Sequence, residues 1–138
     1  MILSPEDSLR WVKANNPKSI ILSGGSASVY DVDAPKIPGE LLDFKIPILG
    51  ICYGMQWLAY THDKDAIHKV TEGKSYGPVE VTLHKSKLFT NLPKSITAWS
   101  SHGDSVKHAG AGFVVTATSK DGGVIEAMEE AQANTSGE

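Results

Sequence analysis

Cysteine is nearly absent from the sequence: Cys52 is the only one in 138 residues, so no disulfide can form within the chain. A basic excess is also missing, because 13 Lys and Arg stand against 16 Asp and Glu, and the net charge of −3 disfavours nucleic acid as a partner. No apolar run approaches the roughly 18 residues that a membrane-spanning helix needs, and Pro5, Glu6 and Asp7 interrupt any signal peptide. The composition therefore predicts a single cytoplasmic domain over residues 1–138, with no membrane partner.

The first half of the chain has the pattern of an α/β protein. A helix is expected to begin after Ser4, which serves as its N-cap, and to end before Pro17. Buried strands are expected at residues 19–22 and 48–52, with a short helix over residues 39–44 between them. Two apolar strands joined through a helical crossover favour an open, mainly parallel sheet with flanking helices.

The second half is expected to be rich in β-strands. Residues 79–83 alternate between apolar and polar side chains, which is typical of a half-buried strand. Further strands are expected at residues 97–99, 113–117 and 124–128. No linker or repeat divides the sequence, so both halves are assigned to one domain.

The segment at residues 46–60 carries the strongest functional signal. An apolar run of strand length ends at Gly50, a G-x-C-x-G turn follows, and the next apolar residues have helical spacing. This is the layout of a nucleophile elbow, with Cys52 in the place of the usual serine. Gly50 and Gly54 would let strand and helix approach closely, and the helix N-terminus would favour the thiolate. A lone cysteine can also be a small buried hydrophobic residue, but the context favours the nucleophile.

Two other segments follow predicted strands. Ser-Gly-Gly-Ser at residues 23–26 offers backbone N–H groups for an oxyanion, although a plain tight turn would have the same sequence. Ser-Ser-His-Gly-Asp at residues 100–104 places His102 beside Asp104, as in a nucleophilic triad, but these residues also form surface turns, which is the favoured interpretation of this segment alone. The five histidines do not stand at ligand spacing with suitable partners, so no metal site is predicted.

Taken together, the segments at residues 20–25, 47–56, 76–77 and 99–104 resemble the class I glutamine amidotransferase domain. Within that family they are most similar to the amidotransferase part of GMP synthases. The discriminating motifs are the Cys-Tyr-Gly-Met-Gln run and the Ser-His-Gly-Asp run, and the likeness extends over about residues 16–129. The resemblance implies a flavodoxin-like α/β fold.

The resemblance also implies a reaction and a set of site residues. Cys52 would attack the side-chain amide of glutamine, form a glutamyl thioester and release ammonia. The backbone N–H groups of Gly25 and Tyr53 would form the oxyanion hole. Substrate-binding roles would fall on Gln56, Ser101, Gly103 and Asp104. No cofactor is implied in this domain, because ATP and Mg would belong to a partner synthetase that uses the ammonia to convert XMP to GMP.

The chain also departs from the family. The family's opening strand and the helix after it, which precede the segment at residues 20–25, are absent, and the sequence contains no His-Pro-Glu segment, where the family has its catalytic His and Glu. We therefore expect a partial domain (a fragment, a truncated product or a degenerate relative) with little or no glutaminase activity of its own. His102 would lie in the turn that holds the substrate and would not be the base.

Three functions stay open on the sequence. The first is a glutaminase part that feeds a GMP synthase-type ligase, and the second is a non-catalytic module that keeps a glutamine-shaped pocket for binding or regulation. The third is an unrelated cysteine hydrolase with an elbow. Gln56 and the Ser-His-Gly-Asp run favour glutamine over the third, whereas the missing base favours the second for this chain alone.

Overall fold

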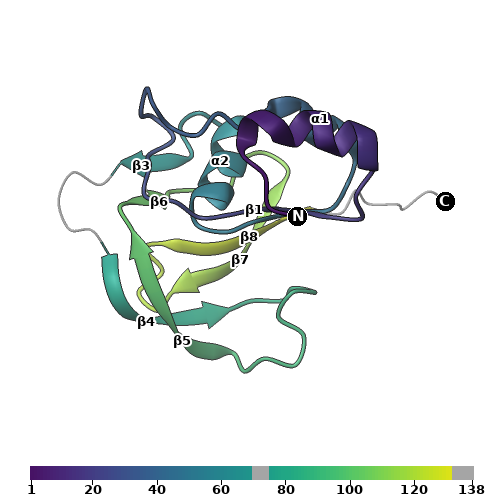
Figure 1. Ribbon diagram of the computed structural model, residues 1–138. Helices are drawn as coiled ribbons and strands as arrows, with labels where there is room; N and C mark the ends of the chain where they lie inside the picture. The colour runs from purple at the N-terminus through teal and green to yellow at the C-terminus, as the bar shows by residue number, and fades with distance from the viewer. Residues whose placement is uncertain (70–74, 132–138) are drawn as a thin grey trace.

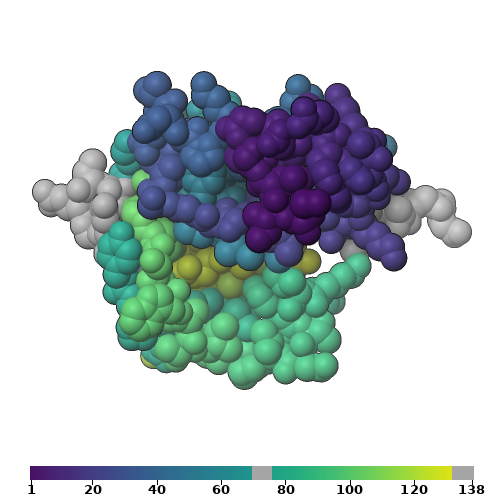
Figure 2. Space-filling view, in the orientation of Figure 1, coloured from purple at the N-terminus to yellow at the C-terminus, as the bar shows by residue number. Residues whose placement is uncertain are grey.

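The computed structural model describes residues 1–69 and 75–131, and it has two layers (Figure 1). The helices and a small parallel sheet form one layer, and a six-stranded sheet forms the other. The space-filling view shows the N-terminal half, in purple and blue, over one side of the molecule and the strands of the second half, in green, over the other (Figure 2). Among the described residues, no helix has the length and apolar character needed to cross a membrane.

The first helix follows the capping pattern of the sequence. Helix α1 spans Pro5–Asn15, and the side chain of Ser4 accepts a hydrogen bond from the backbone N–H of Asp7 at 3.3 Å. The helix ends because Asn16 takes a left-handed conformation, with φ of 44°, ahead of Pro17. Both predicted ends are therefore confirmed. The predicted second helix is also present, as the 3-10 helix η1 over Gly39–Phe44.

The two apolar strands of the first half lie side by side. Strand β1, Ile20–Leu22, pairs in parallel with β2, Ile48–Gly50, as predicted. Helix α2, Tyr53–His62, follows β2 and contacts β1, β2 and two strands of the larger sheet. It buries Tyr53, Trp57 and Leu58 against Leu22 of β1, and Met128 from the larger sheet packs on the same cluster. Helix α2 therefore packs against both sheets, and these contacts hold its first turn in place between them.

The larger sheet is antiparallel and has the strand order β3-β6-β8-β7-β4-β5. Its strands are β3 (Ile67–Lys69), β4 (Ser75–Leu83), β5 (Ser95–His102), β6 (Asp104–Val106), β7 (Phe113–Ser119) and β8 (Ile125–Glu130). The α/β class, the β-rich second half and the four strands predicted there are confirmed. Parallel pairing is confined to β1 and β2 among the described strands, because the later strands follow one another through loops without helical crossovers.

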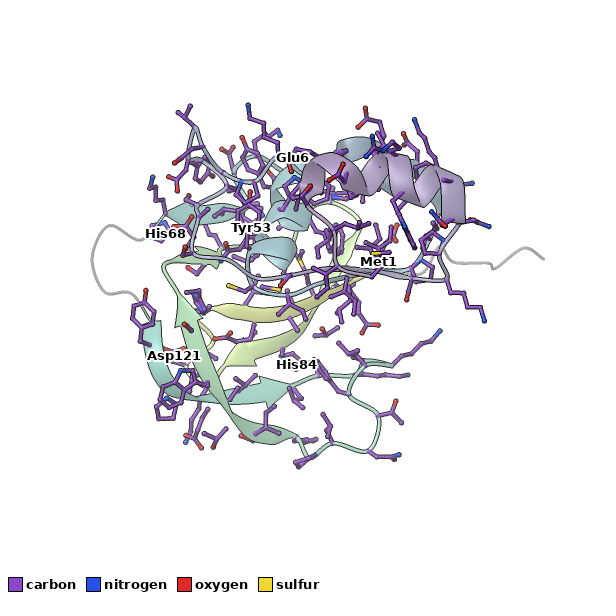
Figure 3. All side chains as sticks on the ribbon, viewed as in Figure 1. Met1, Glu6, Tyr53, His68, His84 and Asp121 are labelled. Carbon is purple, nitrogen blue, oxygen red and sulfur yellow. The ribbon has the colours of Figure 1, made fainter. Side chains whose placement is uncertain are left out.

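The labelled side chains show how the two layers are placed. Tyr53 and His68 lie on the side that carries the helices, whereas His84 and Asp121 lie on the side of β4, β5 and β7 (Figure 3). On the side of β4, β5 and β7, the buried core consists of Val81, Leu83 and Ala117. The residues of the candidate site lie between these regions, where β3 and β6 meet α2.

Candidate functional site

The predicted strand, turn and helix around Cys52 are present. Strand β2 ends at Gly50, and Cys52 is the N-cap of α2. Its backbone has φ of 52° and ψ of −109°, a conformation that non-glycine residues rarely adopt and that costs of order 1–3 kcal/mol. The side chain is partly exposed. A sharp turn thus presents the thiol at the end of the strand, in front of the first turn of a helix.

Glycines on either side of Cys52 make this turn possible. A Cβ on Gly54 would lie 2.3 Å from the backbone oxygen of Leu22, and one on Gly50 would lie 2.6 Å from the backbone carbon of Gly54. Neither distance is tolerable for a carbon atom. The steric reason predicted for the two glycines is therefore present in the structure, since the helix start lies directly on β1 and β2.

The glycine loop after β1 lies against the thiol. The Cys52 Sγ is 3.9 Å from the backbone oxygen of Gly25. A Cβ on Gly24 would lie 3.1 Å from the Cβ of Cys52, which is tighter than most real contacts. The expectation that Gly25 lies close to Cys52 is confirmed, while its role as an oxyanion donor stays a prediction.

A cleft of about 540 Å³ opens at Cys52. It is lined by residues 24–28 from the loop after β1, by Cys52 and Gln56, by residues 101–104, and by Asp31, Lys69 and Tyr76. Every residue that the sequence suggested for the site lies on this cleft except Tyr53. The Tyr53 side chain is buried, and its hydroxyl donates to the backbone oxygen of Pro35 at 3.0 Å. Only the backbone N–H of Tyr53 therefore stays a candidate for the site.

Segment 100–104 is a corner between two strands, although its composition favoured a surface turn. Strand β5 continues to His102, strand β6 begins at Asp104, and Gly103 alone separates them. The corner brings Ser101, His102 and Asp104 to the cleft. It also explains how residues about 50 positions after Cys52 in the sequence come to the same site.

A buried hydrogen bond fixes this corner to the helix. The Gln56 side-chain nitrogen donates to the backbone oxygen of Asp104 at 2.9 Å. Gln56 itself lies one turn after the nucleophile, with its backbone N–H bonded to the Cys52 carbonyl at 3.0 Å. The distance between Cys52 and the corner is therefore set by the first turn of α2. This contact of Gln56 was not expected from the sequence, which suggested a direct contact with substrate.

The carboxylate of Asp104 is the most unusual polar group of the cleft. The residue is 8% exposed, and its Oδ2 is buried without a hydrogen-bond partner. Buried polar atoms in proteins are nearly always paired, so an unpaired carboxylate oxygen on a cleft indicates a place for a donor from a ligand.

The sequence did not suggest three further charged residues of this region. Lys69 Nζ lies 3.4 Å from Asp31 Oδ1 on the cleft. A hydrogen bond from the Ser28 backbone N–H, followed by the ion pair with Lys69, holds the pKa of Asp31 below its ordinary value. Burial raises the pKa of Glu126, and the nearby His102 opposes part of that rise. No motif marks these residues, because each is an isolated charge whose place depends on strand pairing.

The comparisons with known proteins identify the family of the chain. The family model for class-I glutamine amidotransferase matches residues 2–137. A GMP synthase [glutamine-hydrolyzing] of Lactobacillus acidophilus is 47% identical over 122 residues, which are 86% of this chain and 23% of that protein. The GMP synthase [glutamine-hydrolyzing] of Ligilactobacillus salivarius is 43% identical over 129 residues, 92% of this chain and 24% of that protein. The chain thus spans about a quarter of the length of these curated relatives.

Two solved structures share the fold. A glutamine amidotransferase of Thermotoga maritima has a TM-score of 0.67 and 23% identity, covering 80% of this chain and 53% of that chain. A GMP synthase-type protein of Thermoplasma acidophilum has a TM-score of 0.65 and 23% identity, covering 87% of this chain and 60% of that chain. With the family match over residues 2–137, the chain belongs to the class-I glutamine amidotransferase family.

Proposed function

We propose that this chain is the glutamine-binding amidotransferase part of a GMP synthase-type protein, with Cys52 as its nucleophile. The observation that carries the proposal is the strained elbow, which presents Cys52 to a cleft whose other wall is the Ser101–Asp104 corner. A thiol at the start of a helix suits the attack, because the helix N-terminus stabilises negative charge that develops nearby.

Glutamine would enter with its side-chain amide toward Cys52 and its amino and carboxylate ends toward the corner. The backbone N–H groups of Gly25 and Tyr53 would donate to the amide oxygen as it becomes an oxyanion. Support for this orientation comes from the Gly25 loop, whose backbone oxygen lies 3.9 Å from the Cys52 Sγ, and from the buried, unpaired Oδ2 of Asp104 in the corner. Gln56 would hold Asp104 in place through its backbone contact, with Ser101 and Gly103 beside it.

The reaction balances in two steps. The Cys52 sulfur forms a bond to the amide carbon, the C–N bond breaks, and ammonia leaves after its nitrogen gains a proton. Water then attacks the glutamyl thioester, the C–S bond breaks, glutamate leaves, and the thiol recovers a proton. Both steps need a group that moves protons, and the sequence has no His-Pro-Glu segment to supply it.

The ammonia would be used by an ATP-dependent synthetase. The relatives of this chain carry the name GMP synthase [glutamine-hydrolyzing], and the chain matches about a quarter of their length. We propose that a synthetase of this type, which binds ATP and Mg and converts XMP to GMP, receives the ammonia. The cytoplasmic location of such a pair stays a prediction.

A non-catalytic glutamine-binding module is the second candidate. The lack of a His-Pro-Glu segment favours it for the isolated chain, since binding does not need the base. Both candidates share the cleft and differ only in turnover.

Selective labelling of Cys52 tests the site that the two candidates share. A diazoketone analogue of L-glutamine should label Cys52 faster than it labels free cysteine at the same pH, and excess glutamine should protect the thiol. Mass spectrometry locates the label. Equal rates, or a thiol that reacts only after unfolding, would mean that Cys52 is a structural residue and would refute both candidates.

Ammonia or glutamate release from glutamine then separates the two candidates. We expect little or no release by the isolated chain, and Cys52→Ala should remove what there is. Fast release that Cys52→Ala abolishes would establish a catalytic part, whereas labelling without release would establish a binding module only for the isolated chain and would leave a catalytic part dependent on a base from another polypeptide.

A further inference from the structure

The six-stranded sheet has two edge strands, and they are protected to different degrees. Strand β3 at one edge has three residues and ends with Lys69, whereas β5 at the other edge has eight residues (Figure 1). Strand β5, Ser95–His102, contains no proline, lysine, arginine, aspartate or glutamate. Short length, charge and proline are the usual means by which an edge strand avoids pairing with another chain. Among the strands that the structure describes, β5 pairs only with β4, so its outer edge is open.

The pairing of β5 with β4 shows which backbone groups face the open edge. The Leu83 N–H donates to the Lys94 oxygen at 2.7 Å, and these two residues continue the register that joins β4 to β5. Hydrogen-bonded pairs alternate along an antiparallel ladder, so the even-numbered residues of β5 bond to β4. The N–H and C=O groups of the odd-numbered residues therefore point away from β4. These residues are Ser95, Thr97, Trp99 and Ser101.

An exposed apolar patch accompanies this edge. Trp99 is 76% exposed, although tryptophan side chains are usually largely buried. Its register partner on β4 is Pro78, which is also exposed, and Tyr76, two residues before Pro78 on the same face, is 65% exposed. The opposite face of β5 carries Ile96 and Ala98, which pack on the core of the sheet. Aromatic side chains beside unpaired strand backbone are typical of a contact between proteins.

We infer that β5 pairs with β5 of a second copy of this chain, in antiparallel orientation, around a two-fold axis at Trp99. An interface of this kind presents the same surface from both copies, so the strand must be complementary to itself. The odd-numbered residues meet this condition, because Trp99 would face Trp99 of the second copy and Thr97 would face its Ser101. Each pair of facing residues would exchange two backbone hydrogen bonds. The inference goes beyond the proposed function and does not depend on it.

The two faces of the sheet also match in this arrangement. Residues that face each other across the axis are both odd-numbered or both even-numbered, so they project from the same face of the joined sheet. The patches of Tyr76, Pro78 and Trp99 from the two copies would therefore meet on one face. Burial of these side chains at the axis would remove from water the apolar surface that a single copy exposes.

The charges around β5 favour a second copy as the partner. No lysine, arginine, aspartate or glutamate lies within the strand, so like charges do not meet across the axis. Exposed Lys94 precedes β5, and Asp104 begins the strand after it. Antiparallel pairing brings the start of one β5 to the end of the other, so opposite charges would flank both ends of the interface. The contact consists of one strand and one small patch from each copy, which places it among weak interfaces of less than about 1,200 Å².

Sedimentation velocity over a series of protein concentrations tests the association, with a reductant present so that Cys52 cannot link two chains. The unsubstituted chain should shift from the mass of one chain to that of two as the concentration rises. Trp99→Lys and Trp99→Glu should each weaken association by at least about tenfold, because a central tryptophan is lost and like charges face each other. An equimolar mixture of the two variants should associate more strongly than either variant alone, since residue 99 faces itself only at the axis.

Thr97→Pro distinguishes pairing of the strands from contact between side chains. The Thr97 N–H points to the open edge, so proline removes a donor to Ser101 of the second copy and leaves the bonds between β5 and β4 in place. We expect this variant to fold and to lose association. Leu88→Lys is the matched control, because Leu88 is another exposed apolar residue and lies outside β5. This control should associate like the unsubstituted chain.

Amide hydrogen exchange, followed by NMR in the unsubstituted chain, needs no variant. The amides of Thr97, Trp99 and Ser101 should exchange more slowly at concentrations at which the dimer forms. The amide of Ala98, which bonds to β4, should be protected at every concentration. This measurement keeps the inference testable if a substituted chain does not fold.

Three results would overturn the inference. A chain that stays monomeric over the whole series would leave the open edge to a strand of another protein. Association that survives Trp99→Lys, or a mixture that gains nothing over the separate variants, would place the contact elsewhere on the chain. Loss of association in Trp99→Lys but not in Thr97→Pro, without slower exchange at the edge, would mean that side chains stack and the strands do not pair. Thr97 and Trp99 lie outside the lining of the cleft, so none of these results bears on the labelling of Cys52.

Discussion

The substitution Gly54→Ala should loosen the contact on which the elbow depends. The added Cβ would lie 2.3 Å from the backbone oxygen of Leu22 and 2.7 Å from its Cβ, whereas comfortable contacts begin at about 3.5 Å. Helix α2 must therefore move away from β1 by roughly 1 Å. Overpacking costs about 1–3 kcal/mol, and the upper end applies because strand backbone cannot rotate aside. The higher helix propensity of alanine offsets at most about 1 kcal/mol of this.

We therefore expect Gly54→Ala to lower the free energy of unfolding by about 2 kcal/mol, against the roughly 5–15 kcal/mol that is usual for a domain. Urea unfolding followed by tryptophan fluorescence measures this, because Trp57 of α2 lies in the core beside Leu22. The same displacement moves Cys52, so labelling by the diazoketone analogue of glutamine should also slow. Loss of stability without slower labelling would mean that the elbow tolerates the shift.

Gly39→Ala is the matched control for this substitution. Gly39 begins η1, and no heavy atom lies within 4 Å of the position of its added Cβ. The free energy of unfolding of the Gly39→Ala chain should stay within about 0.5 kcal/mol of that of the unsubstituted chain. A Gly54→Ala chain as stable as the Gly39→Ala chain would refute the steric account of the G-x-C-x-G turn.

Three further predictions concern other parts of the site. Gln56→Leu should lower the free energy of unfolding by about 1–3 kcal/mol in urea titrations, because the buried backbone oxygen of Asp104 loses its donor; an unchanged midpoint would contradict this. Glu126→Gln should raise the urea midpoint at pH 7 but not at pH 4. Burial raises the folded-state pKa of Glu126, so the contribution of this carboxyl group to stability falls as the pH rises through the folded-state pKa, whereas glutamine stays neutral. An equal gain at both pH values would contradict this prediction. His102→Ala should leave the low rate of glutamate release unchanged, and loss of a robust rate in both His102→Ala and Cys52→Ala would identify His102 as the base.

Local features of the site could be predicted from the sequence because their causes are local. The strain at Cys52 needs small neighbours two positions away, and the sequence shows them as Gly50 and Gly54. The helix after the turn is marked by apolar spacing. The resemblance also implied that Gly25 lies near the thiol, because it assigned the Gly25 backbone N–H to the oxyanion hole.

Features that depend on pairing between distant strands could not be predicted. Lys69 is brought opposite Asp104 by the register of β3 with β6, and three-residue strands leave no periodic pattern to detect. Glu126 lies at an irregularity in the pairing of β7 with β8, where the side-chain alternation of a strand is interrupted. The six-stranded antiparallel sheet likewise follows from contacts between segments, so the number of parallel strands was overestimated.

On the proposed function, recognition of glutamine and its hydrolysis depend on different groups of the cleft. Gln56 ties the corner at Asp104 to the same helical turn that carries Cys52, so binding groups and nucleophile share one frame. A general base would act only on the Cys52 sulfur and on the leaving nitrogen. Proton transfer of this kind raises the rate of hydrolysis by about 10²- to 10⁴-fold, but the affinity for the substrate does not depend on it. Changes at Asp104 should therefore alter dissociation constants, whereas a base supplied by another polypeptide would alter the rate of turnover. For this reason the catalytic part and the binding module can have the same cleft, and only a kinetic measurement distinguishes them.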